Sequence, residues 1–232
     1  MALTEEIYDL LKKSGAELVG IGTMKNVQHC VYPVGIAVAI SLPVNIIRDL
    51  QNAPTKEYYE MYYALNDKLN RIVTLGVQFL QDNGYQAYAQ TTDVVKVNAD
   101  RVSPIPHKTV ATRAGLGWIG KNCLLVTKEF GSAVRLSSLL TDAPLTVNQP
   151  YDESLCGNCH VCVDACPAGA LKGALWRLDV KRDAIVDKEV CRDKQLEIMK
   201  SATGIEQDLC GKCFAVCAYT QRYIKSTERL NR

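Results

Sequence analysis

Cysteine is concentrated in one short run, Cys156-Gly-Asn-Cys159-His-Val-Cys162-Val-Asp-Ala-Cys166-Pro167. A shorter run follows it downstream, Cys210-Gly-Lys-Cys213-Phe-Ala-Val-Cys217. Thiolates at this spacing are typical ligands of [4Fe–4S] clusters, because a tight loop directs three neighbouring side chains at one cube while a fourth reaches elsewhere. The two runs therefore predict two clusters in the C-terminal part of the chain.

The pairing of ligands follows from the arrangement in bacterial two-cluster ferredoxins, where the fourth cysteine of each run binds the other cluster. One ligand of the second cluster is then missing, because Gln207 stands three residues before Cys210 where a thiolate is expected. Cys191, the only other cysteine in this half of the chain, is the expected replacement. We call the two groups the first cysteine set (Cys156, Cys159, Cys162 and Cys217) and the second cysteine set (Cys166, Cys191, Cys210 and Cys213).

Zinc and disulfides are the alternatives for these cysteines. Structural zinc usually takes separated CxxC pairs, whereas three closely spaced cysteines suit a cubane better. Disulfides require an oxidising compartment. The N-terminus, Met1-Ala-Leu-Thr-Glu-Glu, carries acidic residues where a signal peptide would be basic and then apolar. We therefore expect a cytoplasmic protein with free thiols.

The composition limits the number of domains and the classes of partner that the chain can have. The chain has 232 residues, of which 47% are hydrophobic and 22% charged, enough for one large domain or two modest ones. The net charge of +2 is too small to indicate DNA binding. The longest apolar run, residues 34–44, is short and contains Pro43, so we expect no membrane span. Because exposed cubanes are oxygen-labile, the expected setting is an anaerobe or a low-oxygen organism.

Hydrophobic patterning predicts an α/β domain in the first part of the chain. Thr4 is a plausible N-cap for a first helix. Strands are predicted at residues 17–24 and 32–42, the second buried on both faces. A long helix is predicted over residues 55–83, followed by a strand over residues 85–92. This order predicts an α/β domain over residues 1–150 and a ferredoxin-like domain over residues 151–232.

A glycine-rich loop, Arg113-Ala-Gly115-Leu-Gly117-Trp118-Ile-Gly120-Lys121-Asn122, is the most informative segment without clustered cysteines. Its glycines match the GxGxxG pattern, but that fingerprint needs a strand before it and a helix after it. Here a helix is predicted before the loop and a strand after it. The loop is better read as one whose backbone approaches a large planar or anionic ligand. Its titratable neighbours are Asp100, His107 and Lys108, which are either candidate proton donors or part of a solvated loop.

Together with Glu129-Phe-Gly-Ser, the cysteine run, the lone Cys191 and the terminal CxxCxxxC, this loop resembles the epoxyqueuosine reductase family, whose members are relatives of the reductive dehalogenases. The resemblance implies a nitroreductase-like corrinoid-binding domain followed by a ferredoxin-like domain with two [4Fe–4S] clusters. It also implies bound cobalamin, a ferredoxin- or flavodoxin-type electron donor, and a small-molecule or tRNA-nucleoside substrate. It supports Cys191 as the eighth ligand. The expected cobalamin-binding residues are Arg113, Gly115, Gly117, Trp118, Gly120, Lys121 and Asn122.

The chain departs from the family pattern at three places, of which the first two bear on the substrate. The family's proton-donating acid falls at Arg101, with Asp100 next to it. The chain ends soon after the second cysteine run, without the helical-repeat extension of many members. Ala218 replaces the proline that usually follows the last cysteine. Two hypotheses remain, namely a cobalamin-dependent reductase and a non-catalytic electron-transfer protein that delivers electrons to a partner.

Overall fold

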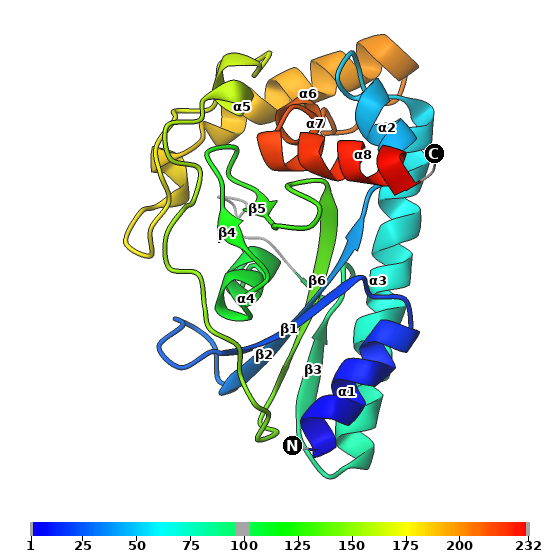
Figure 1. Cartoon of the computed structure of the whole chain (residues 1–232), viewed down its shortest axis with the longest axis vertical. Coiled ribbons are helices and arrows are strands. Elements are labelled where there is room, and N and C mark those ends of the chain that lie inside the picture. Colours follow the sequence, from blue (N-terminus) through cyan, green and yellow to red (C-terminus); the bar gives the residue numbers. More distant parts are fainter. Residues whose placement is uncertain (1, 96–102, 231–232) are drawn as a thin grey trace. The chain divides into compact units, whose positions relative to one another are not determined.

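The computed structural model describes residues 2–95 and 103–230. In the first half of the chain its helices and strands follow the expected order, with the short α2 added (Figure 1). They are α1 (Ala2–Lys13), β1 (Leu18–Thr23), β2 (Val34–Ser41), α2 (Val44–Asp49), α3 (Lys56–Asp82), β3 (Ala87–Gln90), α4 (His107–Arg113), β4 (Trp118–Ile119), β5 (Leu125–Val126), β6 (Val134–Thr141), α5 (Val161–Asp164), a 3-10 helix (Arg182–Ala184), α6 (Lys188–Thr203), α7 (Lys212–Ala215) and α8 (Ala218–Leu230).

The chain forms two compact units, each built from separate segments. The sheet unit comprises Met1–Ile40, Ala64–Gly117 and Arg135–Tyr151, and the cysteine unit comprises Ser41–Tyr63, Trp118–Val134 and Asp152–Arg232. The last passage between them lies at residues 151 and 152, next to the boundary expected from the sequence. Two earlier segments nevertheless join the cysteines. The functional division into a corrinoid-binding part and a cluster-binding part stays a prediction.

The sheet unit contains a four-stranded sheet in the order β1-β2-β6-β3. β1 and β2 are antiparallel with Leu18 opposite Ala39, and β3 and β6 are antiparallel with Ala87 opposite Thr141. All residues of β2 from Val34 to Ile40 are buried, as its continuous apolar run predicted. The three predicted strands and the long helix are confirmed, with ends shortened by one or two residues. β6 was not predicted, because Arg135, Ser137 and Ser138 interrupt its apolar pattern.

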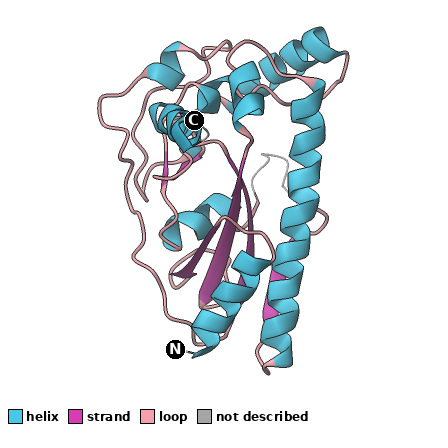
Figure 2. Cartoon of the chain, turned by 45° about the vertical axis from the view of Figure 1, so that its right-hand side comes forward, coloured by secondary structure: helices cyan, strands magenta, loops and turns pink. Residues whose placement is uncertain are grey.

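Two helices, α1 and α3, pack side by side against the sheet, while α4 lies on the opposite side of the strands (Figures 1 and 2). Gly76 of α3 permits this close packing, because a Cβ atom there would lie 2.7 Å from Leu139 of β6 and 3.0 Å from Leu11 of α1. The expected N-cap at Thr4 is wrong. α1 begins at Ala2, and Thr4 lies inside it, where its hydroxyl oxygen accepts a hydrogen bond from the Thr146 amide.

Among the described residues, no helix combines the length and apolar character needed to cross a bilayer.

Both ends of α3 agree with its sequence signals. Thr55 accepts a hydrogen bond from the Tyr58 amide at 3.1 Å, and Gly84 adopts φ +84° just beyond the helix.

Glycines of β1 allow the backbone at the end of α4 to approach the sheet. A Cβ atom at Gly20 would overlap the carbonyl oxygen of Ala114, and one at Gly22 would overlap the backbone of Arg113. The glycine-rich loop begins at these two α4 positions. The close contact between β1 and α4 therefore sets where the loop leaves the sheet unit.

We expect Gly22→Ala to destabilise the chain by about 2 kcal/mol or more, because backbone atoms of Arg113 cannot move aside as a flexible side chain would. Gly84→Ala is the matched control. It places a methyl group at a positive φ with no atom within 4 Å, so it should cost only about 1 kcal/mol. Urea unfolding of the two variants under anaerobic conditions measures both values. Equal losses of unfolding free energy would contradict the close-contact explanation.

Candidate functional site

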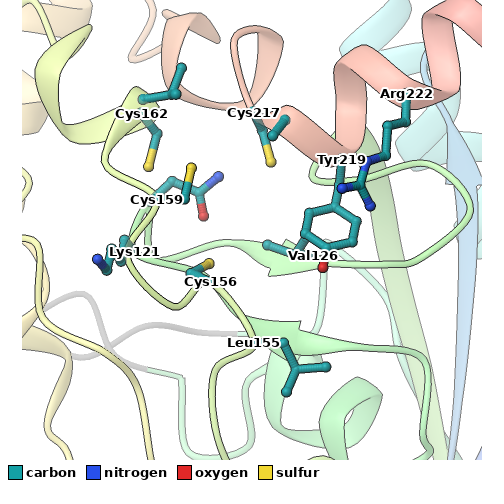
Figure 3. Close-up of a pocket in the computed structure, with 12 residues that line it drawn as sticks. Lys121, Val126, Leu155, Cys156, Cys159, Cys162, Cys217, Tyr219 and Arg222 are labelled. Carbon is teal, nitrogen blue, oxygen red and sulfur yellow. The ribbon is translucent and has the colours of Figure 1, made fainter.

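The four thiols of the first cysteine set line one cavity of about 210 Å³ in the cysteine unit. Their sulfur atoms point into a common space in Figure 3. Cys156 and Cys159 come from the loop before α5, Cys162 from α5 itself, and Cys217 from the residue between α7 and α8. Within the described part of the chain, no three His, Cys, Asp or Glu side chains are arranged around a single metal ion. The thiols instead surround a space much larger than an ion.

Local backbone geometry explains how the first run presents its thiols. Gly157 adopts φ +51°, and the Cys159 amide donates to the Cys156 carbonyl at 3.0 Å, which closes a tight turn. The Val163 amide then donates to the His160 carbonyl at 2.9 Å and begins α5. Three thiols from one short segment can therefore face the same cavity.

The pKa of Cys162 also shows that the four thiols of the first cysteine set lie near one another. Burial and then the neighbouring Cys217, Cys156 and Cys159, in that order, together raise the pKa of the Cys162 thiol to about 12. A thiol in such a place gives up its proton only when a cation compensates the thiolate. The four cysteines predicted to share a cluster are therefore brought together, and binding of a metal group there must release protons.

The second cysteine set is also brought together. Burial raises the pKa of Cys213 well above its ordinary value, and Cys210, Cys191 and Cys166 are among the thiols that raise it further. The pKa of Cys191 is raised by burial and then by Cys166, with a smaller effect from Cys210. Cys191 thus lies within electrostatic reach of the other three members, as the sequence predicted. Its role as their fourth ligand stays a prediction.

Two glutamines near the second cysteine set have defined contacts. Gln195, one turn after Cys191 on α6, donates from Nε2 to the Cys191 sulfur at 3.2 Å. Gln207 stands where a ferredoxin run would have its cysteine. It accepts a hydrogen bond from the Tyr63 hydroxyl at 3.0 Å and donates to Asp208 at 2.8 Å. The position left without a thiol is therefore held in a polar network.

Two residues expected to bind cobalamin line the cavity of the first cysteine set. The Lys121 side chain is 3% exposed, and its Nζ lies 3.2 Å from Nε2 of His160 in the first cysteine run. Asn122 is 5% exposed and donates from Nδ2 to the Ser132 hydroxyl at 2.8 Å. A Cβ atom at Gly120 would lie 2.7 Å from Val126 and 3.5 Å from the Cys156 sulfur. This half of the loop shapes the thiol cavity.

Aromatic packing extends the wall of the cavity. Trp118 is fully buried and meets Tyr219 edge to face, with ring centroids 5.0 Å apart. The guanidinium of Arg222 lies 4.7 Å above the Tyr219 ring. Tyr219 and Arg222 line the cavity (Figure 3). In the sequence, Arg222 looks like one of several basic residues near the end of the chain. Only the structure shows that α8 lies beside the first cysteine run and so brings Arg222 to the cavity.

The remaining loop residues expected at cobalamin belong to the sheet unit. Arg113 ends α4 and is partly buried, and Gly117 is buried. Gly115 needs to be glycine for its own packing, because it adopts φ +71° and a Cβ atom would lie 2.6 Å from the Gln149 carbonyl oxygen. Contact of these residues with cobalamin stays a prediction.

The candidate proton donors differ in how far they can be described. Asp100 and Arg101 lie outside the described residues. Lys108 is in the first turn of α4 and is partly buried. His107 begins α4 and takes part in a buried chain of hydrogen bonds.

This chain of hydrogen bonds defines the tautomer of His107. Gln90 donates from Nε2 to the Ile105 carbonyl at 2.8 Å, so its Oε1 faces Ser138 and accepts the Ser138 hydroxyl at 2.7 Å. With its one proton used, Ser138 must accept from Nδ1 of His107, which lies 2.8 Å away. The proton therefore sits on Nδ1, and Nε2 carries a free lone pair. Burial and the charge of Arg135 lower the pKa of His107 to about 4, so a neutral His107 has no proton on Nε2 to donate.

We expect Cys191→Ala to retain one cluster and to lose or convert the other, because the second cysteine set would be left with three thiols. Iron content should fall from about eight atoms per chain toward about four. Cys30→Ala is the control, since Cys30 lies in the sheet unit and donates to the Tyr32 carbonyl. Iron analysis and electron paramagnetic resonance after anaerobic reconstitution measure both variants. Two unchanged [4Fe–4S] signals in Cys191→Ala would refute the ligand assignment.

The His107 ring should stay neutral, as the Nδ1–H tautomer, while the pH falls from neutrality through the ordinary histidine range. Since the unfolded chain would bind a proton near pH 6.5 and the folded chain near pH 4, this residue stabilises the fold above that interval and the contribution is lost as pH falls through it. Heteronuclear NMR of the 3 histidines reports the tautomer directly. The exposed His29 provides the comparison signal. Protonation of His107 together with His29 would contradict the buried network.

Comparison with known proteins is consistent with this geometry. Residues 155–220 match the family described as a 4Fe-4S double cluster binding domain. An epoxyqueuosine reductase of Bacillus anthracis is 32% identical over 149 residues, which cover 59% of this chain and 35% of that protein. One of Salmonella typhimurium is 38% identical over 122 residues, covering 51% of this chain and 29% of that protein. The matched segment thus spans about a third of these relatives.

Solved structures share the fold along nearly the whole chain. A crystal structure of epoxyqueuosine reductase with a modified tRNA-Tyr stem loop has a TM-score of 0.64 at 20% identity, covering 95% of this chain and 66% of that one. A catabolic reductive dehalogenase has a TM-score of 0.74 at 19% identity, covering 97% of this chain and 33% of that one. The chain is therefore similar in sequence to the epoxyqueuosine reductases, shares its fold with them and with reductive dehalogenases, and matches the 4Fe–4S double cluster binding domain over residues 155–220.

Proposed function

We propose that the protein is a cobalamin-dependent reductase that passes single electrons through two [4Fe–4S] clusters to a bound cobalamin, which reduces an electrophilic substrate. One observation carries the proposal: two sets of four cysteines are brought together in one unit, and they adjoin each other. The pKa of Cys213 in the second set is raised in part by Cys162 in the first. Two clusters so placed form a path for electrons within the cysteine unit.

The first cysteine set fits a cubane in both donors and charge. Four thiols line the cavity together with the buried Lys121, whose ammonium contacts His160 of the first cysteine run. An all-cysteine cubane is anionic, so it would compensate that ammonium. At the second set, the hydrogen bond from Gln195 to the Cys191 sulfur is of the kind that tunes a cluster's potential. The residues present therefore suit clusters better than single ions.

Cobalamin is proposed from the relatives and from the loop. A reductive dehalogenase with B12-dependent dehalogenation shares the fold, with a TM-score of 0.70. When bound, cobalamin would supply a strongly nucleophilic reduced cobalt. We assign its contacts to Arg113, Gly115 and Gly117, since Lys121 and Asn122 are engaged at the thiol cavity. The sequence has no DxHxxG motif to supply a histidine ligand, so we expect the cofactor's own base to be displaced.

The protein's own residues would bind substrate and deliver a proton. We assign proton donation to Asp100, with Lys108 as the alternative, because His107 is neutral and lacks a proton at Nε2. His107 can accept a hydrogen bond there and so orient a substrate hydroxyl or a water. Since the relatives are epoxyqueuosine reductases, we propose a tRNA nucleoside as substrate. A ferredoxin- or flavodoxin-type donor would supply the electrons.

Titration of the cluster-loaded protein with cob(II)alamin should give a base-off absorption spectrum and stoichiometric retention on gel filtration. Gly117→Val should abolish binding because it adds bulk to a buried loop position, while iron content stays at the wild-type level. Gly84→Ala, at a position in the sheet unit with open space around it, is the control that should still bind. Cluster-loaded wild type with no spectral change would overturn the reductase and leave an electron carrier.

A further inference from the structure

We propose that Lys121 is a positioning residue for the cluster of the first cysteine set, whose negative charge its ammonium compensates and whose ligand loop it holds through His160. The inference rests on the proposed function in that it requires a cluster on these four thiols. It assigns Lys121 to the cluster rather than to cobalamin, where the sequence placed it.

The burial of Lys121 is the first argument. Lys121 is 3% exposed, and its one hydrogen-bond partner among the described residues is Nε2 of His160, at 3.2 Å. None of the described residues that line the cavity carries a carboxylate. Burying an ammonium without a counter-charge is costly. Among the described residues that line the cavity, the thiols are the groups that become anions when a cluster binds, so the charge of Lys121 is balanced when they hold one.

The second argument is that the lysine is held rigidly. The neighbouring Asn122 donates to the Ser132 hydroxyl at 2.8 Å, and the Ser132 amide donates to the Thr220 hydroxyl oxygen at 3.0 Å. Thr220 is fully buried in α8, three residues after the ligand Cys217. The segment that carries Lys121 is therefore anchored beside the fourth thiol. From this segment the Lys121 side chain extends to His160, in the loop that carries the other three thiols of the first cysteine set.

His160 completes the link. It lies between Cys159 and Cys162, so its hydrogen bond to Lys121 ties the ligand loop to residues 121–122. Gly173 lies beside the ring, since a Cβ atom there would be in ordinary van der Waals contact with Cε1 of His160, at 3.4 Å. The imidazole accepts from Lys121 through Nε2. Lys121 thereby acts on the positions of the thiols as well as on their charge.

A buried cation at this place raises the cluster's reduction potential. Reduction adds one negative charge to an already anionic cluster, so a nearby ammonium stabilises the reduced form more than the oxidised form. Arg222 is a second cation at the cavity, but its side chain is exposed and stacked on Tyr219, where solvent and salt screen it. The buried Lys121 should therefore have the larger effect.

Potentiometric titration followed by electron paramagnetic resonance tests the proposal on the cluster-loaded protein. Lys121→Gln, which can still hydrogen-bond His160, and Lys121→Met should both shift one of the two midpoint potentials to more negative values. Lys121→Arg should restore it. The shifted signal should be the one that survives Cys191→Ala. Lys225→Met is the matched control, because it removes the same charge from an exposed position of α8 and should shift neither potential.

Wild-type potentials of both clusters in Lys121→Gln and Lys121→Met would overturn the proposal. Loss of the first cluster from these two variants, with retention in Lys121→Arg, would support it because charge then decides whether the cluster is held. Loss from all three variants, Lys121→Arg included, would show that Lys121 only fills space and would overturn it. Failure of the proposed function itself is distinguishable, because the cluster-loaded wild type would then show no spectral change with cob(II)alamin, whereas the two cluster potentials are measured without cobalamin.

Discussion

The constraint on which the cysteine unit depends is the burial of two neighbouring groups of thiols, the first of which shares its cavity with the buried Lys121. Burial and mutual proximity hold the thiols of Cys162 and Cys213 in their protonated forms. A metal group can replace these protons. The thiols, whose closeness makes ionisation costly without a metal, then bind that group together as its ligands. The nearby Lys121 adds a positive charge that four neutral thiols do not balance. Folding of this unit and cluster binding are therefore expected to be coupled.

The glycine-rich loop serves the two units in different ways. In the sheet unit, Gly20 and Gly22 of β1 bring the end of α4 close to the strand, and Gly115 turns the chain in a left-handed conformation. In the cysteine unit, Gly120 makes room for Val126 and the Cys156 sulfur. Each of these glycines is needed for packing within the chain. A GxGxxG pattern can thus arise without a dinucleotide, because close backbone approach is what glycine permits.

The buried chain of hydrogen bonds in the sheet unit gives His107 a different role from the one that its position near the binding loop suggests. The sequence makes His107 one of three candidate proton donors. Ser138 and Gln90 instead use its Nδ1 proton, and burial beside Arg135 keeps the ring neutral. A neutral imidazole with a free Nε2 accepts a hydrogen bond at neutral pH and donates none from that atom. Proton delivery in the proposed reductase then rests with Asp100 or Lys108.

Much of this arrangement could be predicted from local sequence signals, because cysteine spacing, apolar runs and helix ends depend on neighbouring residues. These signals were enough for the two cysteine sets, for β1, β2 and β3, and for the length of α3. They could not reveal β6, whose polar residues are buried against other strands, or the tautomer of His107, which depends on residues from three separate segments. The sequence likewise placed Lys121 and Asn122 with a cofactor of the first domain. Only the tertiary structure puts them beside the thiols, because hydrogen bonds to His160 and Ser132, and from Ser132 to Thr220, join segments far apart in the chain.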